Sequence, residues 1–404
     1  MDIITQFHPL FDSLFRVQRL LLCSFVGGGV LLQPLQLYGN ARVVHHRKSL
    51  WLPRMSEKEF FESKRIKAYL WRLFFPFRYR IVVSVPRRHC QSRLTTLSAA
   101  RAHPTTPVTQ QELEHFFSNT LLKSLENHKK DVTHRYGYDD VHVLLVDNIA
   151  ISAAIDSKRF HNNPDALIGS RGSVIRVSVV QTLCSRTFFG SLMRIIPRRS
   201  TIGYIVEEGF NLAMFMYLKA SAARQNSQAR FILAVVGDRD TTIMQATPES
   251  IAFLDSFRFG WKSICDVLHH HLGIDNTTCI PLCQTLAAGS LSPSVTKGLW
   301  TILNKELSRL VNGMEVFRKE TKIPTIFVDG GLFDFLLAAH PVLGAMEVSA
   351  RKNKGFEISH AHLISRLEAD VYMELLRLPS SMVNRTAAKL IRWLIPNTLW
   401  AHSS

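Results

Sequence analysis

The sequence lacks the short signatures of the most common nucleotide-binding and metal-binding proteins. It has no GxGxxG between a strand and a helix and no GxxxxGK followed by Ser or Thr, which disfavours a Rossmann dehydrogenase and a P-loop NTPase. Its six cysteines include no CxxC pair, so we expect neither a disulfide framework nor a zinc ribbon, and a reducing cytosol is the natural compartment. His269, His270 and His271 with Cys279 and Cys283 suit zinc by residue type, but their spacing favours ordinary helix-end histidines.

Acidic residues are scarce in one part of the chain. Lys and Arg number 49 and Asp and Glu number 32, giving a formal charge of +17. Fifteen of these cations but only three Glu lie in residues 42–101. Such a stretch attracts nucleic-acid phosphates or anionic lipid head groups, or is an ordinary solvated surface. No recognition motif supports nucleic acid as the partner.

Residues 20–37 contain no charged side chain, so a membrane segment must be considered. Three consecutive glycines, Pro34 and two glutamines make a poor spanning helix, and no small-residue cleavage site follows. The composition leaves two alternatives open, a buried strand hairpin and a membrane segment.

The 404 residues, 46% hydrophobic and 20% charged, are sufficient for two domains or for one domain divided into lobes. Capping-box patterns at Ser56 with Glu59 and at Thr109 with Glu112 predict the starts of two helices. We expect a linker over residues 92–108 and loops in the 280s and 290s. Strands are predicted over residues 80–85, 141–146, 149–155, 174–180, 231–236, 243–247, 251–257 and 325–328, and helices over 110–125, 261–271 and 299–317. This alternation favours an α/β protein with mainly internal sheets.

Four landmarks follow one another in the sequence. A glycine run at residues 24–30 stands between apolar segments, and a second loop carries Gly237, Thr241 and Ile243. The third landmark lies between these two loops. It begins with Thr109, Glu112 and Leu113 and continues with Asp156, Asn163, Pro164 and Gly169 before the predicted strand from Val174. The fourth landmark is the pair Gly330 and Gly331, which follows the predicted strand 325–328. In this order the sequence resembles the FtsA and PilM branch of the actin-like ATPases, with two glycine hairpins, an inserted subdomain and a terminal GG loop.

The resemblance implies a two-lobed actin-like (ribonuclease H-like) α/β fold with a small inserted α+β subdomain in the first lobe. The first lobe is expected over residues 1–104 and the inserted subdomain over residues 105–185. A second lobe with a degenerate phosphate loop is expected over residues 186–350. Residues 351–404 are then expected to return to the first lobe and end in an amphipathic tail.

The resemblance also implies a nucleotide site. Its cofactor-binding residues would be Gly27, Gly28, Gly29, Gly237, Thr241, Gly330 and Gly331. The family's aspartates are replaced by Ser24, Val235 and Thr242. Glycine hairpins bring backbone N–H groups to phosphates, whereas carboxylates hold the metal for hydrolysis. ATP and Mg²⁺ are therefore possible ligands, but we assign no catalytic residue and no metal ligand and expect weak or absent ATPase activity.

The C-terminal segment RTAAKLIRWLI places three cations on one helical face, with apolar residues opposite. This is typical of a helix in the lipid interface. Its predicted membrane-binding residues are Arg385, Lys389, Leu390, Ile391, Arg392, Trp393 and Leu394. A last core helix is the alternative. FtsA ends in a similar helix, and PilM does not.

Two functions follow from the resemblance. The first is an FtsA-like cell-division adaptor, cytoplasmic and peripheral at the inner face of the cell membrane, which binds an anionic membrane surface, recruits an FtsZ-like partner and could self-associate. The alternative is a PilM-like cytoplasmic scaffold that binds a segment of a pilus or secretion inner-membrane protein. An ATPase or sugar-kinase-like enzyme would need carboxylates in the hairpins.

Overall fold

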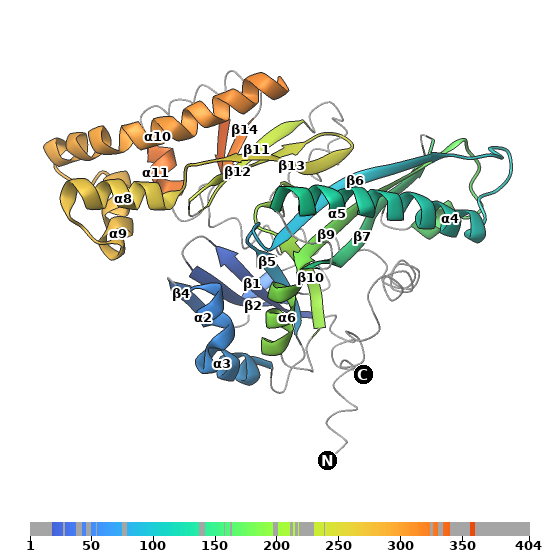
Figure 1. Ribbon diagram of the computed structural model, residues 1–404, viewed down its shortest axis with the longest axis horizontal. Coiled ribbons are helices and arrows are strands. Elements are labelled where there is room, and N and C mark those ends of the chain that lie inside the picture. Colours follow the sequence, from blue (N-terminus) through green and yellow to red (C-terminus); the bar gives the residue numbers. More distant parts are fainter. Residues whose placement is uncertain are drawn as a thin grey trace, which may run out of the picture. The chain divides into compact units, whose positions relative to one another are not determined.

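The computed structural model divides the chain into two compact units, Met1–Glu208 with Ala369–Ser404, and Gly209–Glu368 (Figure 1). Each unit is described by itself. The structure describes residues 18–26, 29–37, 43–45, 50–53, 55–74, 79–136, 142–156, 158–161, 164–196, 201–210, 213–214, 217, 230–237, 239–323, 326–329, 334–339 and 356–359.

The first sheet of the first unit has the strand order β10-β5-β1-β2-β3, and β4 also pairs with β2. β1 and β2 form an antiparallel hairpin, whereas β5 is parallel to β1 and β10 is parallel to β5. The uncharged segment of residues 20–37 is therefore a strand hairpin. The strands are β1 Gln18–Val26, β2 Gly29–Leu37, β3 Val43–His45, β4 Leu50–Pro53, β5 Arg80–Val85 and β10 Thr201–Glu207.

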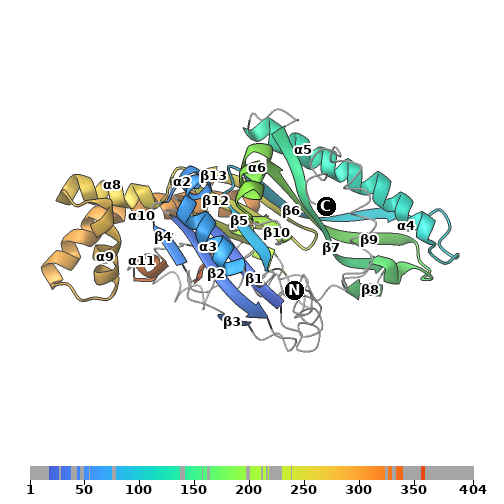
Figure 2. The ribbon, with the colours of Figure 1, turned by 90° about the horizontal axis from the view of Figure 1, so that it is seen from below.

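Three helices pack against this sheet, namely α2 Glu57–Glu62, α3 Lys64–Phe74 and α6 Arg186–Ile195 (Figure 2). The predicted capping box at α2 is present, because Ser56 Oγ accepts the Glu59 N–H and the Glu59 carboxylate accepts the Ser56 N–H at 2.8 Å. A cluster of aromatic rings joins the helices to β1, with centroids 5.2–5.9 Å apart. Its members are Phe25, Phe60, Phe61 and Phe188.

The second sheet of this unit is antiparallel, with the order β6-β9-β7-β8. The linker expected over residues 92–108 was wrong for its first part, because residues 90–100 form β6 and bury Leu94 and Leu97. The two strands predicted within residues 141–155 are one strand, β7, which continues past Asp147 by shifting register against β9. The strands are β6 Cys90–Ala100, β7 Val143–Ile155, β8 Lys158–His161 and β9 Val174–Ser185.

One long helical segment lies along this sheet (Figures 1 and 2). It consists of α4 Gln110–Phe116, a π-helical turn Phe117–Leu121 and α5 Leu122–Tyr136. The Thr109 hydroxyl accepts the Glu112 N–H at 3.1 Å, as predicted, but the reciprocal half of the capping box is replaced by a bond from Arg101 to the Glu112 carboxylate. Helix and sheet together form the α+β subdomain that the sequence predicts.

The second unit has the strand order β15-β14-β11-β12-β13. β11, β12 and β13 form an antiparallel meander, and β14 and β15 run parallel to β11 and to each other. Helices α8, α10 and α11 share one core with strands β11, β12, β13 and β14. The elements are β11 Phe231–Val236, β12 Thr241–Ala246, β13 Ser250–Phe257, β14 Ile326–Asp329, β15 Phe356–Ser359, α8 Trp261–Leu272, α10 Pro293–Thr321 and α11 Asp334–Ala339.

The loops expected in the 280s and 290s were wrong, because Asn276–Ala287 form helix α9 despite Pro281 within it, and α10 already begins at Pro293. Asp275 caps α9, its Oδ1 accepting the Thr278 N–H at 2.8 Å. Cys279 and Cys283 lie one helical turn apart and are completely buried in the core. Burial of this face and the cap outweigh the hydrogen bond that proline removes.

Within the described ranges, no helix combines the length and the apolar character needed to span a bilayer.

Candidate functional site

The first predicted phosphate loop connects β1 and β2. Val26 pairs directly with Gly29 at the end of the hairpin, and Gly27 and Gly28 lie outside the described residues. Ser24, which stands where the resemblance expects an aspartate, is buried between Leu31 on β2 and Ser84 on β5. This part of the sheet therefore presents a hydroxyl where the resemblance would place a carboxylate.

The second predicted loop connects β11 and β12 and is closed by its own backbone. The Gly237 N–H donates to Asp240 O at 3.0 Å, and Gly237 O accepts the Trp261 N–H at 3.1 Å. A Cβ at Gly237 would stand 2.9 Å from Asp240 O, so the close backbone approach requires glycine here. The Thr241 hydroxyl is completely buried and donates to Phe259 O at 2.8 Å. Both predicted residues thus hold the loop against the start of α8.

The acidic positions of this hairpin are occupied by neutral side chains. Val235 is buried and pairs with Thr242 across the hairpin. On its other side Val235 pairs with Asp329, a buried carboxylate at the end of β14 to which sequence reasoning gave no role. Its position directly before Gly330 and Gly331 was the available signal. Those two glycines and Asp238 lie outside the described residues, as do all seven predicted membrane-binding positions, from Arg385 to Leu394.

A charged cavity of about 640 Å³ lies next to this loop. Arg239 and Asp240 come from the loop itself, Arg258 follows β13, and α8 and α10 contribute the rest. No local sequence pattern marks these cations as a site, because they come from separate elements of the chain. The lining residues are Arg239, Asp240, Arg258, Lys262, Ser263, Asp266 and Arg309.

In the first unit, a buried carboxylate lies at the end of β10. Glu207 has no exposed surface; its Oε2 accepts the Ser92 N–H at 3.0 Å, while its Oε1 lies 3.8 Å from Arg87 Nε. The Glu207 N–H donates to the Ser92 hydroxyl at 2.9 Å, so the two residues are bonded reciprocally. Burial raises the pKa of Glu207 to about 7, although Arg87 and the Ser92 N–H act in the opposite direction. Sequence reasoning missed this group, since nothing local marks a strand-end glutamate as buried.

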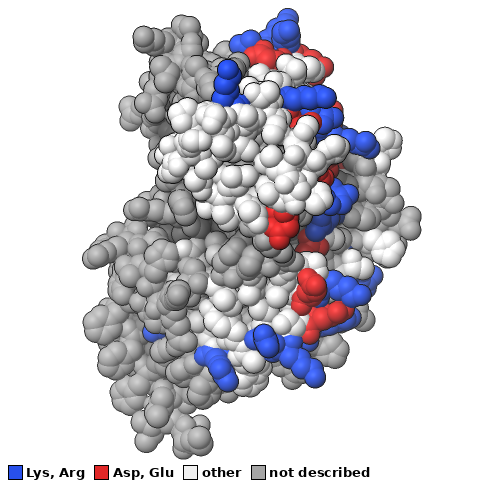
Figure 3. Space-filling view, turned by 90° about the vertical axis from the view of Figure 1, so that its left-hand side faces the viewer, with Lys and Arg blue, Asp and Glu red and all other residues white. Residues whose placement is uncertain are grey.

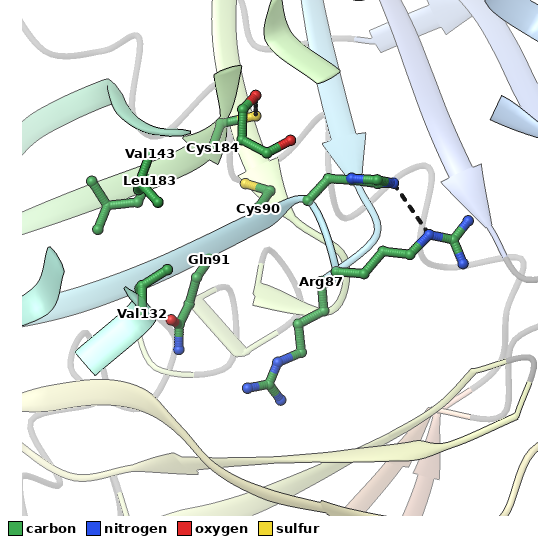
Figure 4. A pocket seen from close by; sticks show the side chains of 10 residues that line it. Arg87, Cys90, Gln91, Val132, Val143, Leu183 and Cys184 are labelled. Atoms are coloured by element: carbon green, nitrogen blue, oxygen red, sulfur yellow. Dashed lines mark hydrogen bonds between the residues drawn. The ribbon is translucent and has the colours of Figure 1, made fainter. Parts of the chain in front are cut away.

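A small pocket near this carboxylate is lined by two facing thiols (Figure 4). Cys90 on β6 is directly opposite Cys184 on β9, and both are buried. The neighbouring Ser185 N–H donates to His89 O at 2.7 Å, so the cysteines occupy the closer, non-hydrogen-bonded kind of antiparallel pair. Burial and contact with Cys184 raise the pKa of the Cys90 thiol. With room for about 10 Å³ of solvent, the pocket holds at most one water molecule.

The cations of the basic stretch are partly neutralised within the first unit. Arg88 contacts Glu57, Arg93 lies 3.6 Å from Asp131, and Arg101 is bonded to Glu112 at 2.6 Å. On the face in Figure 3, which looks onto the left-hand side of Figure 1, Lys and Arg side chains lie among Asp and Glu side chains, next to a broad area without charged side chains. The excess of fifteen cations over three Glu in residues 42–101 therefore overstates the charge that a polyanion would meet, since Asp131 and Glu112 outside this stretch pair with two of the cations.

The candidate zinc residues have other contacts. Cys279 and Cys283 lie in the core of the second unit, and His269 Nδ1 lies 2.8 Å from Ile274 O. Among the described residues, no cluster of three His, Cys, Asp or Glu side chains is arranged to hold a metal ion.

Comparison with known proteins identifies the fold. No family model and no curated protein sequence matches the chain. Among solved structures, the PilM-PilN type IV pilus biogenesis complex matches 89% of this chain and 98% of its own with a TM-score of 0.50 and 14% identity. EutJ from Carboxydothermus hydrogenoformans matches with a TM-score of 0.41 and 10% identity, over 88% of this chain and 89% of its own. Apo ParM of psk41 matches with a TM-score of 0.37 and 10% identity, over 91% of this chain and 99% of its own.

The chain has the α/β fold of the actin-like ATPases, which confirms the fold that the resemblance implies. The PilM structure is one to which the chain is similar over 89% of its length. At 14% identity this similarity establishes the fold alone.

Proposed function

We propose that this protein is a PilM-like cytoplasmic scaffold that binds a segment of a pilus or secretion inner-membrane protein. The observation that carries the proposal is the closure of the second hairpin. Gly237 and Thr241 bond to Asp240 and to Phe259, and the family's acidic positions hold Val235 and Thr242. A hairpin whose two family acidic positions hold Val235 and Thr242 is poorly suited to hold Mg²⁺ for hydrolysis, so binding would be the protein's main activity.

The partner is suggested by the solved PilM structure, which is a complex with PilN. The test is a pull-down from native membranes with the full-length chain as bait, followed by direct binding of synthetic cytoplasmic segments of each recovered protein. The proposal expects a pilus or secretion inner-membrane protein whose segment binds the purified chain. Direct binding of FtsZ, with no such inner-membrane protein recovered, would contradict it.

ATP is the possible cofactor in this proposal. Asp329, beside Val235, is a buried carboxylate near the loop, so nucleotide affinity and turnover should be measured separately. We expect calorimetry to detect at most weak Mg-ATP binding and phosphate release to be no faster than in a Thr241→Val control. Submicromolar affinity with rapid turnover would identify an enzyme.

An FtsA-like adaptor is the second candidate, and the sequence pattern of residues 385–395 favours it. Such an adaptor would bind anionic membranes through this tail, recruit an FtsZ-like partner and self-associate. Deleting residues 385–404 should then abolish binding to liposomes that contain phosphatidylglycerol. Equal liposome binding by the full-length and truncated chains would exclude this role for the tail.

A further inference from the structure

We propose that Cys90 and Cys184 are a redox-active dithiol, which a small peroxide such as hydrogen peroxide converts to a disulfide between β6 and β9. Both cysteines are buried, and each is directly opposite the other in the register of the two strands. Both side chains reach the small pocket in Figure 4. The site involves no protein partner, so it is independent of the proposed scaffold function.

The two thiols occupy a position at which side chains of this length meet. The pair is of the non-hydrogen-bonded kind, because the Ser185 N–H donates to His89 O at the adjacent pair. Cα atoms in such a pair are about 4.5 Å apart, which is within the range of roughly 4.4–6.8 Å for disulfides. At the next pair of the same kind, the hydroxyl oxygens of Ser92 and Thr182 are 3.0 Å apart. A disulfide at the cysteines therefore requires little movement of either strand.

The cysteines lie where the chain enters and leaves the inserted subdomain. Cys90 begins β6, shortly after β5 ends at Val85. Cys184 is the penultimate residue of β9, and the last, Ser185, caps α6 by accepting the Phe188 N–H at 3.3 Å. Between the two cysteines lie the rest of the second sheet of this unit and the long helical segment. A bond between them would close the inserted subdomain into a covalent loop at its base.

The pocket restricts the size of the oxidant. It has room for about 10 Å³ of solvent, or at most one water molecule. Hydrogen peroxide can reach the thiols after a small displacement of the lining, whereas a peptide disulfide such as oxidised glutathione cannot. Burial and contact with Cys184, and to a smaller extent Glu207, raise the pKa of the Cys90 thiol, so thiolate is scarce. We therefore expect slow oxidation, on the order of tens of minutes in millimolar peroxide.

The oxidation consumes one molecule of hydrogen peroxide. One thiol gives up its proton to the pocket water, and its sulfur attacks a peroxide oxygen. The O–O bond breaks, which leaves a sulfenic acid and a hydroxide ion that recovers the proton as water. The second thiol then attacks the sulfenic sulfur, and the departing hydroxyl group takes the proton of that thiol as a second water. The two thiols lose two electrons in all, and a dithiol reductant reverses the change.

The experiment treats the reduced full-length chain with millimolar hydrogen peroxide. Remaining thiols are alkylated under denaturing conditions, and disulfide-linked peptides are mapped by mass spectrometry before and after dithiothreitol. Cys90→Ala and Cys184→Ala each remove one partner, and Cys23→Ala, at a buried cysteine on β1, is the matched control. Circular dichroism melts compare the reduced and oxidised forms. Because the mapping is done first on the wild type, the test does not depend on the folding of a variant.

We expect one reversible crosslink, between Cys90 and Cys184, in most molecules of the wild type and of Cys23→Ala, and in neither of the other variants. Oxidation should raise the melting temperature of the wild type by about 5–10 °C, because the disulfide closes a long loop in the unfolded chain. Cys90→Ala should show no such rise.

Three results would overturn the proposal. The first is recovery of both cysteines of the peroxide-treated wild type as alkylated thiols. The second is their conversion to sulfinic or sulfonic acids without a crosslink. The third is crosslinks to Cys23 that form as often as the one between Cys90 and Cys184. Crosslinking by oxidised glutathione at the same rate would overturn the assignment of a peroxide as the oxidant.

Discussion

Two buried polar side chains, Glu207 and Thr241, are hydrogen-bonded within the fold. Glu207 and Ser92 bond each other reciprocally, and Thr241 donates to Phe259 O. The pKa of Glu207 is raised by burial to about 7, so the folded state holds a proton there that the unfolded chain has released above pH 4.5. From these contacts we predict how the stability of the first unit depends on pH and how much a substitution of Thr241 destabilises the second unit.

Glu207 should make the stability of the first unit depend on pH. Because the folded pKa is the higher one, the stabilisation is complete below pH 4.5 and is lost as the pH rises through about 7. The loss amounts to about 3 kcal/mol, at 1.36 kcal/mol per pKa unit. Urea unfolding at pH 5 and pH 8 should show this decline in the wild type and a clearly smaller one in Glu207→Gln, where Asp147, whose pKa burial also raises to about 7, still contributes. Glu249→Gln, an exposed control, should keep the decline; a flat wild-type profile would disprove the assignment.

Thr241→Val should destabilise the second unit by about 1–3 kcal/mol, because Phe259 O would lose its buried donor. Thr242→Val, at a half-buried position next to it, should cost less. Thermal unfolding of both variants measures the difference. Equal costs would show that the hydroxyl is not a structural bond of the hairpin.

At the scale of the element, Arg101 joins four segments of the inserted subdomain. Its guanidinium is almost fully buried and donates to both carboxylate oxygens of Glu112, to Gly172 O at 3.0 Å and to Thr106 O at 3.1 Å. The end of β6, the start of α4 and two loops therefore depend on one side chain. Lysine lacks the planar arrangement of donors that these acceptors require.

Arg101→Met should reduce the free energy of unfolding by about 1–3 kcal/mol, since it leaves two carbonyl groups without their donor, whereas the Glu112 carboxylate can be solvated. Arg101→Lys should recover only part of this loss. Arg176→Met, at an exposed position on β9, should cost little. Urea titration of the three variants measures their free energies of unfolding. If Arg101→Met costs as little as Arg176→Met, Arg101 does not have this structural role.

Elements with strong local signals could be predicted from the sequence. The capping pattern at Ser56, the apolar run before Gly237 and the helix from Trp261 are confirmed. Errors arose where packing outweighs propensity. Residues 92–100 are rich in Ser and Thr and were therefore predicted to be a linker, but these side chains form hydrogen bonds across the strands, as Ser92 does with Thr182. Helix α9 forms despite Pro281 because its other face is buried. The charged cavity could not be predicted, since it assembles side chains up to seventy positions apart.

At the scale of the whole molecule, the second unit is continuous in sequence and has its own core. A continuous segment with a closed core is expected to fold alone. A fragment of residues 209–368 should therefore unfold cooperatively by circular dichroism and give dispersed amide resonances. A non-cooperative melt would mean that this unit depends on the rest of the chain.

The ladder between β6 and β9 has a consequence for how related sequences differ. Along one face, like side chains meet directly: Cys90 with Cys184, Ser92 with Thr182 and Thr96 with Ser178, the two hydroxyl pairs at 3.0 and 2.9 Å. A change in one member would leave its buried partner with an unsuitable neighbour, whereas a matched double change would not. These three pairs of positions are therefore expected to covary in homologues, so that an alignment would show which residues of β6 and β9 pair with each other.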